Sequence, residues 1–186
     1  MSTKKSKAPN HGVTGLSISQ EEVDLFLDYL VESEPEQAKV HENAKETANI
    51  DIRDAEIHYI DAKENRLYRI LNKIAISANK YFNYAINGIE TAQIIHYKAP
   101  SNGYGYHIDI GPEGTAANRK ISMTLSLNEE YEGGELCFRT GDNANCTRPK
   151  MGEIVAFSSF ISHQVKPVTK GDRYVVVAWF TGPPFR

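Results

Sequence analysis

The sequence predicts an α+β fold in which N-terminal helices pack on one sheet of a β-sandwich or jelly roll. Before residue 88, apolar residues recur at helical spacing. After residue 88, short apolar runs alternate with polar residues and are separated by Gly, Asn and Pro. Short alternating runs are typical of half-buried strands, and many such strands with these turns indicate a sandwich or jelly roll.

Two segments before residue 88 have the pattern of amphipathic helices. Residues 19–22 form a capping box that precedes an apolar face at helical spacing. A longer helix is expected from about 64 to 86, ended by Asn87-Gly88. Its apolar stripe comprises Leu67, Ile70, Leu71, Ile74, Ala78, Tyr81 and Phe82. We expect three parts in the chain: a disordered tail over 1–18, a helical support region over 19–87 and a jelly-roll domain over 88–186.

Later segments predict strands with distinct faces. From 120 to 127, polar and aliphatic residues alternate, which predicts a polar face that lines a wet cavity. From 173 to 180, Arg173 shares one face with two valines and Trp179. An arginine on so apolar a strand is costly unless it is paired, so it indicates a buried anion. A shorter alternation at 50–60 predicts an edge strand.

Potential metal ligands occur at a spacing that suits one site. His107-Ile108-Asp109 places an imidazole and a carboxylate two residues apart, so on a strand both would emerge on the same side. His163, from a distant strand, would complete three ligands. Two neutral imidazoles and one carboxylate, with the other positions open, is the arrangement of non-haem Fe(II) oxygenases. Arg173 adds forked donors suited to the carboxylate of a co-substrate.

These motifs and their flanking residues resemble the prolyl 4-hydroxylase-like branch of the Fe(II)- and 2-oxoglutarate-dependent dioxygenases. The resemblance is greatest to the small PKHD-type hydroxylases of bacteria and bacteriophages. It runs in the family's order through segments 94–97, 105–109, 119–122, 131–136, 152–157, 163–180 and 182–186. It implies a double-stranded β-helix, the jelly-roll scaffold shared with cupins.

The resemblance also implies roles for individual residues. The expected catalytic residues are His107, Asp109, His163 and Arg173. The first three would ligate Fe(II), and Arg173 would hold the distal carboxylate of 2-oxoglutarate.

Three further residues are expected to contact the co-substrate. Tyr97 would place its hydroxyl against the same distal carboxylate, and Trp179 would lie near the co-substrate. Some relatives carry a tyrosine at the position of Ser126, and this chain departs from that pattern. A serine can still hydrogen-bond there.

The implied activity is hydroxylation of an unactivated C–H bond, with a prolyl or other peptidyl side chain as substrate. O2 and 2-oxoglutarate would be consumed, succinate and CO2 released, and ascorbate would serve as reductant. Two alternatives stay open. One is a hydroxylase of a free amino acid or small metabolite, and the other is a non-catalytic jelly-roll protein that binds a metal or ligand.

The charge of the chain argues against a nucleic-acid partner. The 21 basic and 24 acidic residues give a net charge of −3, and no basic stripe is present in the sequence. Nucleic-acid demethylases with the same metal motif typically carry a second arginine six residues after the first, where this chain has Trp179. We therefore expect a peptide or small-molecule substrate.

The two cysteines, Cys137 and Cys146, flank a Gly-Asp-Asn loop and could approach each other. No signal peptide or apolar run of membrane length precedes them. We therefore expect a cytoplasmic protein with reduced thiols and no membrane partner.

Overall fold

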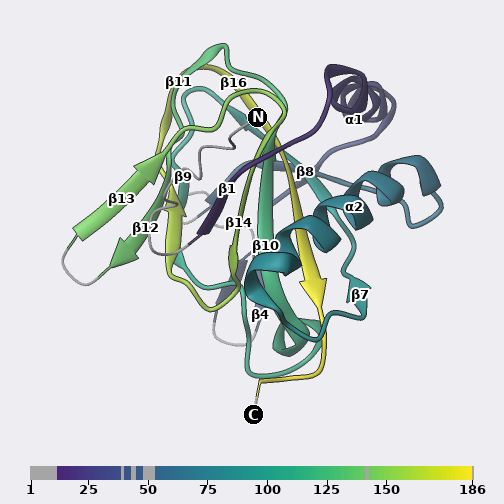
Figure 1. Ribbon diagram of the computed structural model, residues 1–186. Coiled ribbons are helices and arrows are strands. Elements are labelled where there is room, and N and C mark those ends of the chain that lie inside the picture. The colour runs from purple at the N-terminus through teal and green to yellow at the C-terminus, as the bar shows by residue number, and fades with distance from the viewer. Residues whose placement is uncertain (1–11, 39, 43–44, 48–52, 141–142, 186) are drawn as a thin grey trace, which may run out of the picture.

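The computed structural model shows two antiparallel sheets, with both helices on the outer side of the larger sheet (Figure 1). It describes residues 12–38, 40–42, 45–47, 53–140 and 143–185. The predicted α+β jelly roll with helices on one sheet is confirmed. No helix in the described ranges is long and apolar enough to cross a bilayer.

The larger sheet runs through the middle of the molecule. Among the described residues it has nine strands, in the order β1, β14, β10, β16, β8, β6 and β2, with β7 and β11 also paired to β16. Their bounds are β1 Gly12–Ser17, β2 Glu36–Gln37, β6 Glu56–Tyr59, β7 Gly88–Ile89, β8 Gln93–Lys98, β10 Arg119–Ser126, β11 Tyr131–Gly133, β14 Glu153–Ser158 and β16 Val168–Thr181.

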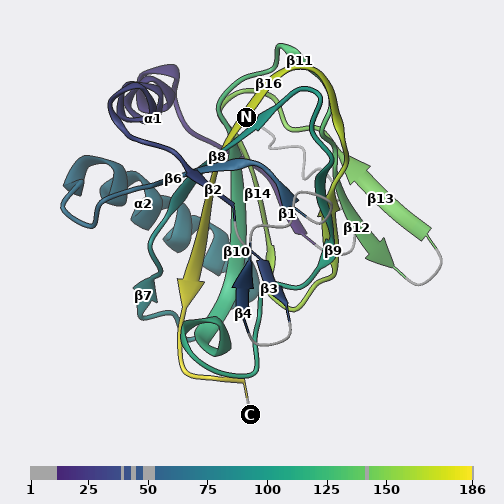
Figure 2. The same cartoon turned by 180° about the vertical axis from the view of Figure 1, so that it is seen from behind.

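The smaller sheet lies on the side away from the helices and is seen from behind in Figure 2. Its order is β13, β12, β15, β9 and β5. The bounds are β5 Arg53–Asp54, β9 Gly103–His107, β12 Leu136–Thr140, β13 Asn143–Thr147 and β15 His163–Val165. A separate hairpin pairs β3 (Val40–Glu42) with β4 (Lys45–Thr47), and a 3-10 helix spans Thr115–Asn118.

Helix α1 (Gln20–Glu32) begins at the predicted capping box. The Ser19 hydroxyl accepts a hydrogen bond from the Glu22 backbone N–H, and the Glu22 carboxylate accepts one from the Ser19 N–H. Both bonds satisfy N–H groups that a helix start leaves without partners. Val23 and Phe26 are buried in the core shared with the sheet. The predicted helix start is confirmed.

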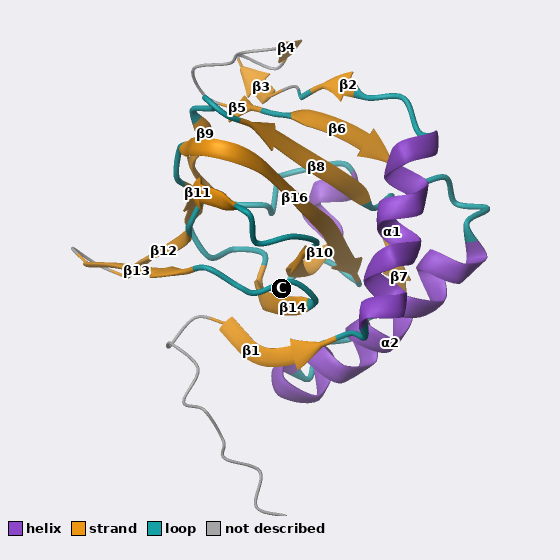
Figure 3. Ribbon diagram, turned by 90° about the horizontal axis from the view of Figure 1, so that it is seen from above, coloured by secondary structure: helices purple, strands orange, loops and turns teal. Residues whose placement is uncertain are grey.

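Helix α2 (Asn65–Phe82) covers the larger sheet beside α1 (Figure 3). Its buried residues are Leu67, Ile70, Leu71, Ile74, Ala75 and Ala78. The predicted end near residue 86 is wrong, because Asn83 takes the left-handed conformation (φ 53°, ψ 39°) and stops the helix. Gly88 instead begins β7. Tyr81 is 65% exposed and does not belong to the apolar stripe.

Strand β10 has the two faces that its alternation predicts. Its aliphatic residues join the core beneath the helices: Ile121, Met123 and Leu125, followed by Leu127. The opposite face carries Ser122, Thr124 and Ser126, which are also buried. These hydroxyl groups therefore form the predicted polar face, and this face points into the interior between the two sheets.

The N-terminal part of the chain contributes more to the sheets than expected. The tail predicted over 1–18 is wrong for residues 12–17, because β1 pairs with the edge of β14 and satisfies main-chain groups there. The support region predicted over 19–87 also contains β2, β5 and β6, which belong to the two sheets. The strand predicted at 50–60 is confirmed in part as β5 and β6, and Ile50 and Ile52 lie outside the described residues.

Cys137 and Cys146 form a disulfide across the β12–β13 hairpin. The hairpin register places the two residues directly opposite each other. The expectation of reduced thiols is therefore wrong. The sequence shows that the two cysteines are nine residues apart, but it does not show the β12–β13 register that brings their side chains together.

Replacing Cys146 with alanine is expected to lower the free energy of unfolding by about 3 kcal/mol, because a short cross-linked loop restricts the unfolded chain. Urea unfolding of oxidised parent and variant would measure the difference. Dithiothreitol should destabilise the parent by a similar amount and leave Cys146→Ala unchanged. Equal stability of all four samples would contradict the prediction.

Candidate metal centre

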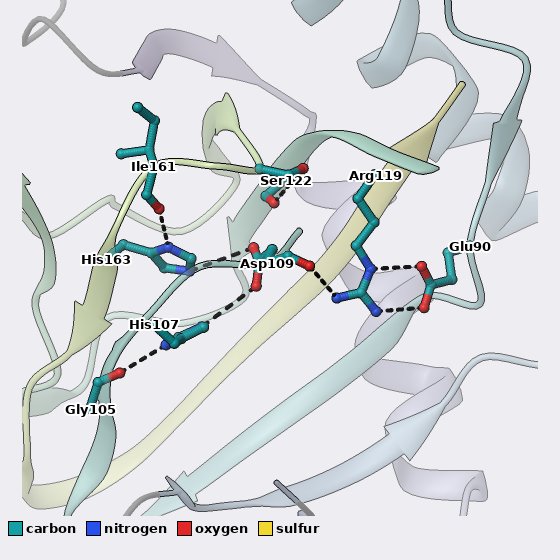
Figure 4. Close-up of polar contacts among 9 residues, drawn as sticks. Glu90, Gly105, His107, Asp109, Arg119, Ser122, Ile161 and His163 are labelled. Carbon is teal, nitrogen blue, oxygen red and sulfur yellow. Dashed lines mark hydrogen bonds and ion pairs between the residues drawn. The ribbon is translucent and has the colours of Figure 1, made fainter. Parts of the chain in front are cut away.

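Three side chains converge between the two sheets, from elements far apart in the sequence. His107 is the last residue of β9 and His163 the first of β15, and the two lie directly opposite each other in the smaller sheet. With Asp109 they each offer one ligand atom, and these atoms lie within 4.8 Å of one another. Figure 4 shows the two imidazoles directed at the carboxylate. The structure thus brings together all three sequence-predicted ligands.

Asp109 departs from the expected geometry, because it does not lie on the strand that carries His107. Strand β9 ends at His107, and Asp109 occupies a bend beyond it. Its backbone N–H donates to the Ser159 carbonyl oxygen at 2.9 Å. The prediction that one strand carries both His107 and Asp109 is therefore wrong, and tertiary contacts place the carboxylate.

The same kind of local hydrogen bond orients both histidines. Each Nδ1 lies at hydrogen-bond distance from the carbonyl oxygen two residues earlier, 2.8 Å for His107 to Gly105 and 2.9 Å for His163 to Ile161. A carbonyl oxygen only accepts, so Nδ1 carries the proton and the Nε2 lone pair is left for a metal. The Nε2 atoms lie 3.5 Å and 3.6 Å from the Asp109 carboxylate oxygens.

The surroundings favour the protonation states that metal binding needs. Burial by itself would raise the pKa of Asp109, but the adjacent His107, His163 and Ser122 hold that pKa well below its usual range. Burial lowers the pKa of His163 to about 4, against the opposing pull of the Asp109 carboxylate. Metal ligation requires an ionised Asp109 and a neutral His163, and both are present at neutral pH.

The metal-free protein is expected to lose stability as the pH falls from about 6.5 toward 4. Over this range an unfolded chain protonates His163 while the folded chain does not, so unfolding is favoured by roughly 3 kcal/mol at the lower limit. Urea unfolding at several pH values would measure the slope. His163→Gln should show a smaller loss over the same range, and a parent-like slope in this variant would contradict the assignment.

Arg173 is a buried cation with unused donors. It is 2% exposed, and neither Nε nor Nη1 has a hydrogen-bond partner in the part of the chain that the structure describes. The guanidinium carbon lies 5.2 Å from the Tyr97 ring centre and 6.0 Å from that of Tyr131. Gly134 leaves the room it needs, since a Cβ there would lie 2.7 Å from the Arg173 Cδ. A buried guanidinium with free donors is well suited to an anionic ligand.

The residues expected at the co-substrate lie at different places in the interior between the two sheets, which we call the chamber. Tyr97 is paired with Arg173 across β8 and β16, as a shared role in carboxylate binding requires. Ser126 is buried near the same end, opposite Val175, but its hydroxyl donates to the Asn128 carbonyl oxygen at 3.0 Å. The proton of the Ser126 hydroxyl is therefore already used in a hydrogen bond within the protein.

Trp179 lies at the other end of the chamber from Arg173. Trp179 lies six positions after Arg173 on an extended strand, about 20 Å away at the usual rise per residue. The Trp179 ring lies 3.9 Å below the Arg119 guanidinium carbon, and its Nε1 has no partner among the described residues. This places Trp179 on the Asp109 side, because Arg119 donates to the Asp109 carbonyl oxygen.

Sequence reasoning assigned no role to Arg119, Glu90 or Ser159. The three residues contact Asp109 or support a residue that does. None of them belongs to a local motif with the metal ligands. The spacing of the sequence carried no signal that could have found them.

Comparison with known proteins agrees with this arrangement. The family described as the 2OG-Fe(II) oxygenase superfamily matches residues 92–181, a segment that contains all three clustered residues and Arg173. The matched segment, residues 92–181, is just under half of the chain. The chain is 40% identical over 80 residues to a PKHD-type hydroxylase of Prochlorococcus marinus (strain NATL1A), an alignment that covers 42% of the chain and 36% of that protein. It spans about a third to a half of the length of the curated relatives it matches.

Two solved structures show that the chain has the fold of prolyl hydroxylases. A prolyl-4-hydroxylase of Pseudomonas putida is 19% identical, covers 94% of each chain and has a TM-score of 0.74. A prolyl hydroxylase of Trichoplax adhaerens, in complex with a peptide fragment of hypoxia inducible factor, is 21% identical and has a TM-score of 0.69. It covers 87% of this chain and 77% of its own.

The superfamily implies Fe(II) and 2-oxoglutarate, and the residues present fit both. Two imidazole nitrogens and a carboxylate oxygen are a donor set that ferrous iron accepts while open positions remain. The buried guanidinium of Arg173 has unpaired donors for a carboxylate. The fit therefore rests on the three donor atoms and on two Arg173 donors that have no partner among the described residues.

Proposed function

We propose that the chain is an Fe(II)- and 2-oxoglutarate-dependent dioxygenase that hydroxylates an unactivated C–H bond. The observation that carries the proposal is the convergence of His107, Asp109 and His163 in a fold that also buries Arg173, whose Nε and Nη1 have no partner among the described residues. A purely structural role does not explain Arg173, because a buried cation whose donors lack partners destabilises a protein. The products would be the hydroxylated substrate, succinate and CO2.

The protein's own residues would bind and orient the reactants. His107 and His163 would hold the metal through Nε2, with Asp109 as the anionic ligand. Arg173 would bind the distal carboxylate of 2-oxoglutarate, and the Tyr97 hydroxyl would donate to the same group. Burial raises the pKa of Tyr97, so its hydroxyl keeps the proton needed for donation.

The chamber wall would keep water away from the ion pair. Val175 is 2% exposed and belongs to the same buried cluster as Tyr97, with Val165 and Val177 packed against it. An ion pair is stronger where water is excluded. Fe(II), when bound with 2-oxoglutarate and O2, supplies the oxidising power that C–H hydroxylation needs.

A prolyl or other peptidyl side chain is the proposed substrate. Two findings support this choice: the matching relatives are named PKHD-type hydroxylases, and the similar Trichoplax adhaerens structure holds a peptide fragment. Ascorbate is proposed as a reductant on the resemblance alone. The cytoplasmic location stays a prediction, and the Cys137–Cys146 disulfide argues against it because reducing compartments keep thiols reduced.

The proposal is tested in two steps with the full chain. Anaerobic addition of Fe(II) and 2-oxoglutarate should give a visible charge-transfer band, and oxygen should then release succinate. A panel of proline-containing peptides should increase succinate release and yield a product heavier by one oxygen atom. A panel of free amino acids serves as the contrast, and turnover confined to it would overturn the peptide substrate. Absence of both band and succinate would overturn the dioxygenase.

A further inference from the structure

Asp109 lies two residues beyond the end of β9, so the strand pairing of β9 does not hold it in place. Its backbone is held on two sides. The N–H donates to the Ser159 carbonyl oxygen at 2.9 Å, and the carbonyl oxygen accepts from Arg119 Nη1 at 3.0 Å. The carboxylate leaves the same residue, so its position depends on these two contacts.

The Arg119 side chain is itself fixed by Glu90. Arg119 Nε and Nη2 donate to the two Glu90 carboxylate oxygens at 2.7 Å and 2.6 Å, which is a bidentate pair (Figure 4). Both side chains are less than a fifth exposed, at 17% and 19%. The Trp179 ring covers one face of the guanidinium. Such a pair is directional as well as strong, so Nη1 has little freedom to leave the Asp109 carbonyl oxygen.

Glu90 is in turn attached to the larger sheet. It follows β7 directly, and its backbone N–H donates to the Trp179 carbonyl oxygen at 2.9 Å on β16. The chain of contacts therefore runs from the centre of the larger sheet through Glu90 and Arg119 to Asp109. The bend that carries Asp109 gains a rigid support that its local sequence does not provide.

The Glu90 charge has a second consequence. Without Glu90, the largely buried guanidinium of Arg119 would lack a counter-charge. The nearest available anion would then be the Asp109 carboxylate, next to the carbonyl oxygen that Arg119 already contacts. An arginine bound to that carboxylate would compete with a metal. Glu90 therefore orients Arg119 toward the main chain of Asp109. It also keeps the positive charge of Arg119 away from the carboxylate oxygens of Asp109.

We propose that Glu90 and Arg119 are positioning residues that hold Asp109 in the geometry of a metal ligand. This inference rests on the proposed function, because it takes Asp109 as a ligand. It goes beyond that function by assigning the ion pair a role in metal affinity. Neither side chain is placed among the ligands themselves.

The test is a double-mutant cycle with Co(II) as the metal probe, in the absence of 2-oxoglutarate and substrate. Arg119→Met and Glu90→Gln are each expected to weaken Co(II) binding about 10- to 100-fold, as loss of supporting contacts around a metal site typically does. The double variant should bind no more weakly than Arg119→Met alone, since Glu90 acts through Arg119. Arg119→Lys keeps the positive charge but lacks the forked donors, so its Co(II) affinity should stay close to that of Arg119→Met.

The matched control is Glu132→Gln, which removes the charge of an exposed ion pair with Lys170. It should leave Co(II) affinity unchanged. Thermal unfolding of every variant separates affinity from folding, and the Co(II) absorption spectrum reports the ligand geometry. Parent-like affinity and spectrum in folded Arg119→Met would overturn the inference. Failure of the parent to bind Co(II) would instead overturn the proposed function.

Discussion

Replacing Asp109 with asparagine is expected to reduce 2-oxoglutarate turnover at least about 1000-fold, equivalent to about 4 kcal/mol of transition-state stabilisation. The substitution keeps the shape of the side chain and removes its charge. Both histidines are directed at this carboxylate, and its low pKa shows how strongly the surroundings favour the anion. Succinate release under saturating Fe(II) measures the effect.

The control for this experiment is Asp28→Asn, which changes an exposed carboxylate on α1. It should turn over at the parental rate. Co(II) binding to Asp109→Asn should weaken in parallel with turnover, because the loss originates in ligation. If folded Asp109→Asn kept turnover within tenfold of the parent, the assignment of the three ligands would be wrong.

Replacing Arg173 with methionine should have opposite effects on co-substrate binding and on stability. The KM for 2-oxoglutarate is expected to rise at least about 100-fold, because a buried charge-assisted pair is lost. The ligand-free protein is expected to gain about 1 to 3 kcal/mol of stability, because two buried donors without partners disappear. Initial rates of succinate formation and urea unfolding without ligand measure the two quantities.

Ligand-induced stabilisation provides the internal control for Arg173. In the parent, 2-oxoglutarate with metal should raise the melting temperature, since it binds only the folded state. Arg173→Met should show little increase at the same concentration, while Arg173→Lys should show an intermediate one. A methionine variant that is less stable without ligand and still stabilised by 2-oxoglutarate would contradict the assigned role.

Much of the fold could be predicted from local patterns. The capping box at Ser19 and the alternation of β10 depend on neighbouring residues, so the helix start and the two strand faces were predicted correctly. The end of α2 was predicted incorrectly. Asn83 and Gly88 both suit a helix end, and only the tertiary structure shows that the helix stops at Asn83. The disulfide was missed for a similar reason, since its formation depends on the β12–β13 register.

For the candidate site, the sequence by itself determined which groups are available for chemistry: two imidazoles, a carboxylate and a guanidinium. Tertiary structure alone decided how they are held. Asp109 lies beyond its strand and is placed by Ser159 and Arg119, which are remote from it in the chain or belong to no shared motif. Trp179 shares a strand face with Arg173 but lies at the opposite end of the chamber. Chemical identity is a property of single residues, whereas orientation depends on contacts between segments that only folding brings together.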